Sequence, residues 1–298
     1  MKLINVACPI CESKNNYQIL YKKNFRISDL NVKTFSARRL PDKIHYQLVK
    51  CNKCGLVRSN PVADRTILNK LYEKSFLTYD DEIHNLTETY INSVMPTLKT
   101  LPKKARILEV GCGNGFILNK IYELGFKNIF GVEPSIDAVK KSDKRIKNNI
   151  KISILKSDLF EPNSFDFIFF FQTFDHIPNP NQFLSICFKL LKQNGSILSF
   201  NHNINSFSSK FLGERSPIFD IEHTFLYSPI TMGLIFQKNK FNVINTYSPN
   251  NILSLKHLLW LIPLPKSIKK YILNTNLKLL DQKINIKLGN ICLDAKKT

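Results

Sequence analysis

The sequence lacks the long hydrophobic runs and the dense basic blocks that mark membrane-spanning segments and nucleic-acid-binding tails. Its most apolar C-terminal stretch, residues 252–265, is too short and too interrupted to cross a bilayer. The first residues contain no long apolar core, so a secretory signal is not expected and we predict a cytoplasmic location. Lysine and arginine give a formal net charge of +20, but they are scattered along the chain. This charge is weak support for a polyanionic partner, and nucleic acid is not the expected one.

Cysteine is also scarce, and four of the seven cysteines form two Cys-x2-Cys pairs. Because disulfides are rare in a reducing compartment, the pairs predict a structural zinc site whose ligands are Cys8, Cys11, Cys51 and Cys54. Four thiolates fill a tetrahedral zinc site and leave no position for a catalytic water. Gly55 suits a left-handed turn after the second pair, whereas Glu12-Ser13 takes that place after the first. Residues 1–60 are therefore expected to form a zinc ribbon, with unmetallated free thiols as the alternative.

Only 10 residues are glycine, and three of them alternate at Gly111, Gly113 and Gly115. An apolar run at 107–110 precedes them, and apolar residues recur at helical spacing from Phe116, which predicts a buried strand, a turn and a helix. Alternate glycines let a ligand approach the main chain. In a parallel sheet such a turn lies beyond the carboxyl end of a strand, where ligands bind. Alone, the pattern also suits NAD sites, FAD sites and ordinary tight turns.

An acidic residue follows each of three successive strand-like runs. Glu109 ends the first run, and Glu133 ends the second at 129–133, a spacing of 24 residues that suits a carboxylate on ribose hydroxyls. Asp158 follows a third run at 152–155, where it could reach an adenine amino group. The alternative for each acid is a helix cap or a solvated loop carboxylate.

In order, these motifs resemble those of class I S-adenosylmethionine-dependent methyltransferases. The resemblance rests on Glu109-x-Gly111-x-Gly113-x-Gly115, Gly131-Val132-Glu133-Pro134-Ser135, Ser157-Asp158-Leu159, and the run from Phe165-Asp166-Phe167-Ile168 to Asp175-His176-Ile177. It implies an α/β fold over residues 105–298, with a Rossmann-like seven-stranded sheet, helices on both faces and S-adenosylmethionine as methyl donor. Glu109 and the glycine turn would hold the methionine end, Glu133 the ribose and Asp158 the adenine. The implied cofactor-binding residues are Glu109, Gly111, Cys112, Gly113, Asn114, Gly115, Glu133, Pro134, Ser135, Asp158, Leu159, Phe171 and Gln172.

The remaining elements follow from apolar spacing. Residues 61–104 are expected to form a helical lid of two helices, with Tyr72, Tyr79 and Tyr90 lining the cofactor or simply packing. The run 165–171 predicts a central strand covered on both faces, followed by a helix at 180–191 and a strand at 196–200. The last strand, at 292–296, is expected to run antiparallel at the sheet edge. Residues 257–265, followed by lysines, are interpreted as an interfacial helix or as a packing or dimer contact.

Acceptor binding is assigned to insertions at about 201–232 and 248–285. His223 lies there beside Glu222 and close to Tyr227. A neutral imidazole, with an ordinary pKa of about 6.5, could remove a proton as the methyl is transferred, with Glu222 or Asp220 orienting it. The alternative is a structural histidine that caps the next helix. His176 is expected to shape the methionine pocket more than to take a proton.

The two cysteine pairs, the core and the Glu222-His223 pair together resemble the sugar methyltransferases of deoxysugar and surface-glycan pathways, including zinc-containing C-methyltransferases. This resemblance implies that His223 is the base and that Glu222, Tyr227 and His176 complete the catalytic set. The acceptor would be a small-molecule, nucleotide-linked or lipid-linked sugar, with peripheral membrane contact in the last case. Ile221 stands where the C-methylating enzymes commonly carry histidine, so O-methylation is expected at least as much as C-methylation. An RNA methyltransferase and a non-catalytic cofactor-binding scaffold remain the alternatives.

Overall fold

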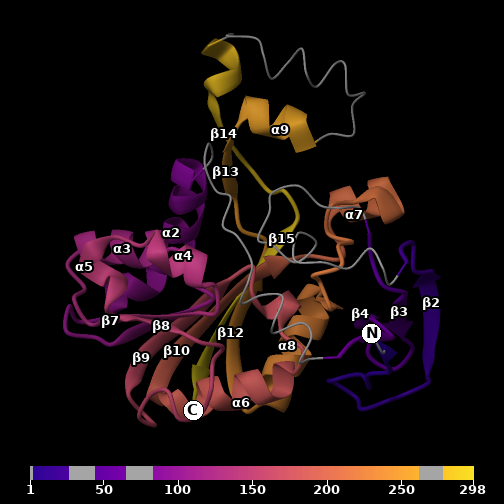
Figure 1. Ribbon diagram of the computed structural model, residues 1–298, viewed down its shortest axis with the longest axis horizontal. Helices are drawn as coiled ribbons and strands as arrows, with labels where there is room; N and C mark the ends of the chain where they lie inside the picture. The colour runs from indigo at the N-terminus through magenta and orange to yellow at the C-terminus, as the bar shows by residue number, and fades with distance from the viewer. Residues whose placement is uncertain (1–2, 27–43, 65–82, 262–277) are drawn as a thin grey trace.

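A mostly parallel seven-stranded sheet forms the centre of the computed structural model, which describes residues 3–26, 44–64, 83–261 and 278–298 (Figure 1). The strand order is β12-β15-β10-β9-β6-β7-β8. The five strands that pair in parallel are β6 (Ile107–Val110), β7 (Ile129–Glu133), β8 (Ile150–Ile152), β9 (Phe165–Phe171) and β10 (Leu191–His202). The predicted α/β fold with its seven-stranded sheet is therefore confirmed.

The last strand corrects one expectation. β15 (Asn290–Lys297) runs antiparallel to both neighbours, as predicted, but it lies between β10 and β12 (Phe241–Tyr247) and not at the edge. The chain reaches the outer position first, through β12, and then returns to fill the gap beside β10. β12 is thus the edge strand on this side of the sheet.

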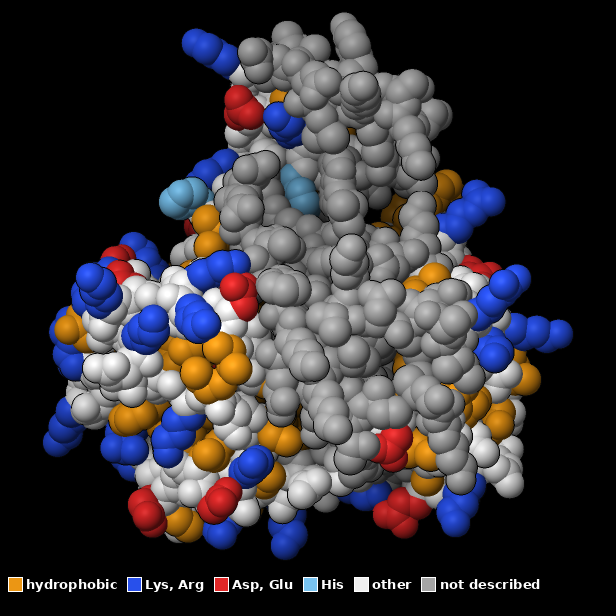
Figure 2. Space-filling model, in the orientation of Figure 1, with side chains coloured by type: hydrophobic (Ala, Val, Ile, Leu, Met, Phe, Trp, Pro, Cys, Tyr) orange, Lys and Arg blue, Asp and Glu red, His pale blue; other side chains and the backbone are white. Residues whose placement is uncertain are grey.

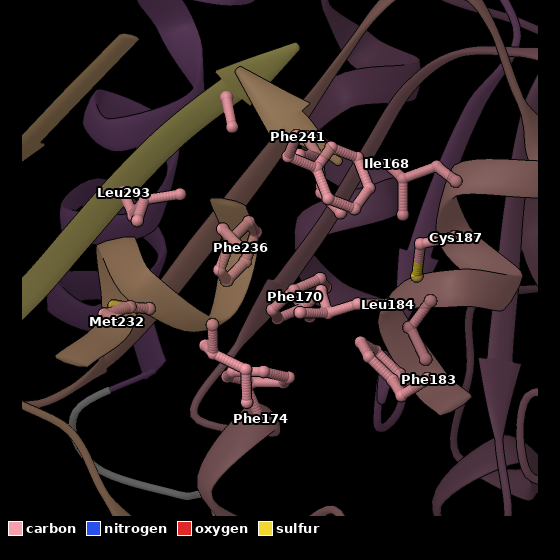
Figure 3. Close-up of a cluster of buried hydrophobic side chains, with 14 of the residues drawn as sticks. Ile168, Phe170, Phe174, Phe183, Leu184, Cys187, Met232, Phe236, Phe241 and Leu293 are labelled. Carbon is pink, nitrogen blue, oxygen red and sulfur yellow. The ribbon is translucent and has the colours of Figure 1, made fainter. Parts of the chain in front are cut away.

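Helices cover both faces of the sheet because its strands are apolar on both sides. Along β9, Phe167, Phe169 and Phe171 pack in one buried cluster and Ile168 and Phe170 in another, as the two-residue period of a strand requires. On the first face lie α2 (Ile83–Thr100), α3 (Phe116–Glu123), α4 (Ile136–Lys140) and α5 (Lys144–Lys147). On the second lie α6 (Pro180–Leu190) and α8 (Pro229–Lys238), whose apolar side chains meet β9 and β15 (Figure 3).

The helix α2 is one of the two predicted lid helices. The other predicted lid helix, with Tyr72 and Tyr79, lies outside the described residues. Tyr90 of α2 is buried, and its ring stacks on Phe171 with the centroids 4.0 Å apart and the planes 6° from parallel. Tyr90 therefore packs over the end of β9.

An N-terminal module adjoins the core, and we call it the cysteine module because it carries the four paired cysteines. Its described strands are β1 (Leu3–Ile4), β2 (Tyr17–Tyr21), β3 (Leu48–Cys51), β4 (Val57–Ser59) and β5 (Val62–Ala63). The sheet order β11-β4-β3-β2 includes β11 (Phe225–Leu226), which comes from the distant segment that follows His223. The cysteine module and the segment that follows His223 thus share one sheet.

The remaining short elements complete the description. They are η3 (Phe174–His176), α7 (Phe207–Leu212), η4 (Gly213–Arg215), β13 (Asn251–Ser254), α9 (Leu255–Leu261), η5 (Lys278–Asp281) and β14 (Lys283–Ile286). The helix α9 overlaps the start of the predicted interfacial helix at 257–265, and the rest of that prediction lies outside the described residues. In the part of the chain that the structure describes, no helix combines the length and hydrophobicity needed to cross a bilayer.

Candidate active site

The glycine turn connects β6 to α3 in a conformation that side chains resist. Gly111, Gly113 and Gly115 all have positive φ, at 74°, 56° and 73°. A Cβ on Gly111 would come within 2.4 Å of the Thr173 hydroxyl, and one on Gly115 within 2.6 Å of Ile146. Both the backbone and the surrounding space therefore require glycine. The turn brings main-chain groups to the carboxyl edge of the sheet.

Glu109 is a buried carboxylate at the end of β6, with 3% of its surface exposed. Its Oε2 atom has no hydrogen-bond partner among the described residues. Burial, followed by the nearby charge of Glu133, raises the pKa of Glu109 well above its ordinary value. A buried acceptor left without a donor is costly, so this atom fits a ligand that brings an ammonium or another N–H group. The amino group of the methionine end of S-adenosylmethionine is such a donor.

Glu133 braces the glycine turn from the next strand. Its Oε2 accepts a hydrogen bond from the Gly113 amide at 2.9 Å, and its Oε1 accepts one from the Ser135 amide at 2.8 Å. Burial raises the pKa of Glu133. Each carboxylate oxygen keeps a second lone pair that a ribose hydroxyl could use. Ser135 in turn caps α4 by accepting from the Ala138 amide, and Pro134 lies between the two.

The third acid is less tightly placed. The run predicted at 152–155 is a strand only at Ile150–Ile152, because β8 is an edge strand whose pairing with β7 stops at Ile152. Asp158 lies six residues further on, in a turn, with its side chain exposed, and Leu159 packs partly against the core. Its contact with adenine stays a prediction.

The other predicted cofactor residues divide between packing and polar roles. The Cys112 thiol is buried, and a Cβ on Gly131 would lie 2.6 Å from its sulfur, so Cys112 fills the space behind the turn. Gln172 follows β9 with a φ of 47° and donates through Nε2 to Asn290 at 3.2 Å. The buried oxygens Asn114 Oδ1 and Gln172 Oε1 have no partner among the described residues. They are acceptors available to a ligand at this edge.

Asp175 gathers a cluster of histidines at the same edge of the sheet. Its buried carboxylate accepts hydrogen bonds from His202 Nδ1 at 2.8 Å and from Asn201 Nδ2 at 3.0 Å. His176 Nε2 lies 3.6 Å and His223 Nε2 4.0 Å from its oxygens. Burial alone would raise the pKa of Asp175, but the surrounding histidines hold it below its ordinary value. The cluster thus combines one anion with three imidazoles.

The orientation of His223 fixes its tautomer. Its Nδ1 lies 2.8 Å from the Ile218 carbonyl oxygen, which can only accept, so Nδ1 carries the proton. In the neutral ring Nε2 then holds a lone pair directed toward the cluster. Burial and nearby His202 lower the pKa of His223, while Asp175 opposes that shift. Burial also lowers the pKa of His176 to about 4. Because its pKa is lowered, His223 is neutral near pH 7 and can accept a proton. The nearby Asp175 carboxylate would stabilise the imidazolium that forms.

The four paired cysteines converge on one point. Cys8 and Cys54 have their sulfurs 3.4 Å apart, as do Cys11 and Cys51, and all four sulfurs lie within 4.8 Å of one another. These separations suit thiolates on a tetrahedral zinc ion, where Zn–S bonds of about 2.3 Å set the sulfur spacing. The described residues contain one further set of candidate metal ligands, Asp175, His176 and His223.

The two cysteine turns have matching backbones even though their sequences differ. The Glu12 amide donates to the Cys8 carbonyl at 2.8 Å, and the Gly55 amide donates to the Cys51 carbonyl at 2.9 Å. Glu12 has a φ of 62° where Gly55 has 78°. Glutamate therefore adopts the left-handed conformation that the sequence associates with glycine.

Comparison with known proteins identifies the family. The methyltransferase domain family matches residues 83–246, which is more than half of the chain. The chain belongs to this methyltransferase family.

Similar proteins agree on the core but differ in the acceptor that they are named for. The mitochondrial ubiquinone biosynthesis O-methyltransferase of Dictyostelium discoideum is 24% identical over 139 residues, 42% of each chain. The tRNA U34 carboxymethyltransferase of Helicobacter pylori is 35% identical over 109 residues, 33% of this chain and 41% of that one. The part of this chain that aligns therefore spans less than half the length of each of these two relatives. A structure of a Haloferax volcanii methyltransferase complex with the Trm112 activator aligns with 73% of this chain and 94% of that one, at 13% identity and a TM-score of 0.50, which supports the fold.

The cysteine module of this methyltransferase directly supports the His223 segment. β4 pairs with β11, and the Ser59 amide donates to the Thr224 carbonyl at 2.9 Å. The Ser59 hydroxyl donates to the His223 carbonyl at 3.3 Å. The Thr224 amide then donates to the Asp175 carbonyl at 2.9 Å. A chain of contacts thus runs from the cysteine turns to the histidine cluster.

The structure also places the other predicted catalytic residues of the methyltransferase. Tyr227 is fully buried, its ring stacks on Phe174 at 5.0 Å, and its hydroxyl has no partner among the described residues. Glu222 is buried beside His223, and its amide donates to Asp220 Oδ1 at 3.1 Å. The roles of both stay predictions.

Two members of the histidine cluster, Asn201 and His202, were not among the site residues predicted from the sequence. The signal that could have revealed them is their position just after the predicted strand at 196–200, at the edge where the other acids end.

Proposed function

We propose that this methyltransferase methylates a hydroxyl of a sugar or surface-glycan intermediate, with His223 as general base. The observation that carries the proposal is the protonated Nδ1 of His223 on the Ile218 carbonyl, which leaves the Nε2 lone pair at the histidine cluster. Bound S-adenosylmethionine supplies a methyl group on a positively charged sulfur. His223 would take the hydroxyl proton on Nε2 as the oxygen–methyl bond forms and the sulfur–methyl bond breaks, which leaves the neutral thioether S-adenosylhomocysteine, and Asp175 would stabilise the resulting imidazolium.

On the donor side, Glu109 and the glycine turn would hold the methionine end, Glu133 the ribose and Asp158 the adenine. The support is the buried unpartnered oxygen of Glu109 and the two amides that fix Glu133 against the turn. The site therefore gains its rate mainly by holding the two reactants in line and excluding water.

We further propose that the cysteine module binds one structural zinc ion through Cys8, Cys11, Cys51 and Cys54. The converging sulfurs and the matched turns support this assignment. Zinc there would fix the start of β4, which carries Ser59 to the His223 segment. A cytoplasmic location, where cysteines stay reduced, is part of the same proposal.

The atom methylated is proposed to be oxygen rather than carbon. Ile221 stands before Glu222 where the C-methylating enzymes commonly carry histidine, and several relatives are named as O-methyltransferases. A tRNA acceptor is the second candidate, because the chain has a net charge of +20 and a relative is named for tRNA U34. A tRNA acceptor predicts binding that weakens steeply with salt, so the absence of RNA binding at low ionic strength argues against it.

The test is the His223→Ala substitution, assayed with a panel of free, nucleotide-linked and lipid-linked sugars by the mass gain of one methyl group. Turnover is expected to fall by about 10²–10⁴-fold while S-adenosylmethionine binding is unchanged. The matched control is His84→Ala, because His84 is exposed on α2. Unchanged turnover in His223→Ala removes this residue from the mechanism. Turnover that depends on added Mg²⁺ or Mn²⁺ would instead assign Asp175, His176 and His223 to a metal.

A further inference from the structure

The helix α7 presents two aromatic side chains outward, while Ser209 and the N-cap residue Ser206 face inward. Phe207 and Phe211 are 82% and 78% exposed, and their rings stack 5.9 Å apart with planes 7° from parallel. By contrast, Ser206 and Ser209 are buried, and the Ser206 hydroxyl accepts from the Ser209 amide at 3.1 Å. Single exposed apolar side chains are common on proteins, but two large ones that stack on one face of a helix form a contiguous apolar patch, which indicates a binding surface.

Two exposed basic residues lie close to this aromatic pair in the sequence. Lys210 lies between the two phenylalanines in sequence, and Arg215 follows in η4; both are exposed. The end of β2 approaches η4, since the Tyr21 hydroxyl would be 3.6 Å from a Cβ on Gly213, and two exposed lysines, Lys22 and Lys23, follow Tyr21 in the sequence. In the orientation of Figure 1, hydrophobic side chains lie beside Lys and Arg side chains at the edge of the molecule where α7 is drawn (Figure 2).

One acid and one pocket lie beside these basic side chains. Glu214 of η4, with 47% of its side chain exposed, contacts the buried imidazole of His45 at 3.0 Å. It sets one negative charge against the positive charges of Lys210, Arg215 and Lys50. Lys210 and Lys50 both line a pocket of about 320 Å³ between α7 and the cysteine module. An anionic group would find two ammonium groups at this pocket.

We propose that α7 is a membrane-docking surface that binds an anionic lipid bilayer. Phe207 and Phe211 would enter the boundary between headgroups and acyl chains, while Lys210 and Arg215 contact lipid phosphates. A second copy of the chain is a poorer occupant, because a symmetric contact would bring like charges together and two phenylalanines fall far short of the area of a stable dimer.

The position of α7 gives this surface a consequence for catalysis. Phe207 comes five residues after His202, which bonds to Asp175 at the histidine cluster. Docking through α7 would bring the acceptor side of the enzyme to the membrane, where a lipid-linked acceptor is concentrated. The docking itself does not depend on the proposed function, since it is measured without turnover.

The experiment is co-sedimentation of the full chain with phosphatidylcholine vesicles, with and without added phosphatidylglycerol. The wild type is expected to bind the anionic vesicles, and Phe207→Ser/Phe211→Ser to bind them at least about tenfold more weakly, since two aromatic side chains no longer insert. Lys210→Gln is expected to lose about fivefold. The matched control is Ile244→Ser, which removes another exposed apolar side chain, 58% exposed on the edge strand β12.

Unchanged thermal unfolding and S-adenosylmethionine binding in each variant show that the fold is intact. The proposal is overturned if the wild type binds neither vesicle, if it binds neutral and anionic vesicles equally, or if the double variant binds like the wild type. A concentration-dependent dimer in light scattering that the double variant abolishes would assign the surface to self-association and overturn it as well.

Discussion

The Glu109→Gln substitution is expected to weaken S-adenosylmethionine binding while it stabilises the cofactor-free protein. Glu109 Oε2 is buried at the end of β6 without a partner among the described residues, so the free protein carries the cost of that carboxylate. Bound cofactor would offset the cost by bringing a cationic donor. The two effects therefore have opposite signs, which a residue that merely packs would not produce.

The size of each effect follows from the chemistry of the carboxylate. A hydrogen bond to a charged group contributes about 1.5–3 kcal/mol, so its loss should raise the Kd for S-adenosylmethionine by about 10- to 150-fold. In the free protein, removing the buried charge should raise the free energy of unfolding by about 1–3 kcal/mol at pH 8.

The pH dependence gives the sign check. Because the pKa of folded Glu109 lies above its ordinary value of 4.5, the folded state holds more protons than the unfolded state between those two values. Wild-type stability should therefore fall as pH rises from about 4.5 through the raised pKa. The variant lacks this loss, so its advantage in the free energy of unfolding should grow with pH and vanish in acid.

The assays are calorimetric titration with S-adenosylmethionine and thermal unfolding with and without it at several pH values. Glu123→Gln is the matched control, since Glu123 is an exposed glutamate on the adjoining helix α3, paired with Lys120 and Arg145. Equal affinity in wild type and Glu109→Gln would refute the assignment of Glu109 to the methionine end. A cofactor-free variant less stable than the wild type at pH 8 would refute the account of its burial.

Two further predictions concern the histidine cluster and the cysteine module. Asp175→Asn should lower turnover on the order of 100-fold while the affinity for S-adenosylmethionine is retained. Because the Asp175 carboxylate raises the pKa of His223, the substitution should also move the acid limb of the pH–rate profile to lower pH. An acid limb that does not move would show that Asp175 does not act on the base. Cys51→Ser should reduce the zinc content, measured by elemental analysis, from one ion per chain to a substoichiometric level. It should also lower turnover, because β4 carries Ser59, which bonds to the His223 carbonyl. Full zinc content in the variant would contradict the four-sulfur site.

The central strands and the glycine turn were predictable because their signals are local in sequence. The continuous apolar run at 165–171 requires cover on both faces, and the strand β9 has those bounds. The alternating glycines likewise predict a turn with positive φ values, and all three glycines have them. Local sequence patterns did not predict where an edge strand ends or which residue adopts a left-handed conformation, because contacts with neighbouring segments determine both. Among the described strands β8 pairs with β7 alone, and this pairing stops at Ile152. Glu12 has a positive φ because it occupies the position in its cysteine turn that Gly55 occupies in the other.

The histidine cluster was only partly predictable, because contacts between distant segments assemble it. His223 could be singled out from its acidic neighbour, but the groups that set its chemistry come from elsewhere. Asp175 follows β9, His202 ends β10, and Ser59 lies in β4, 164 residues from His223. No periodicity links these positions. Since β11 pairs with β4, any change that loosens the cysteine module should reach His223 before it reaches Glu109, which is held by β6 within the central sheet. Loss of the cysteine site should therefore reduce turnover before it reduces cofactor affinity.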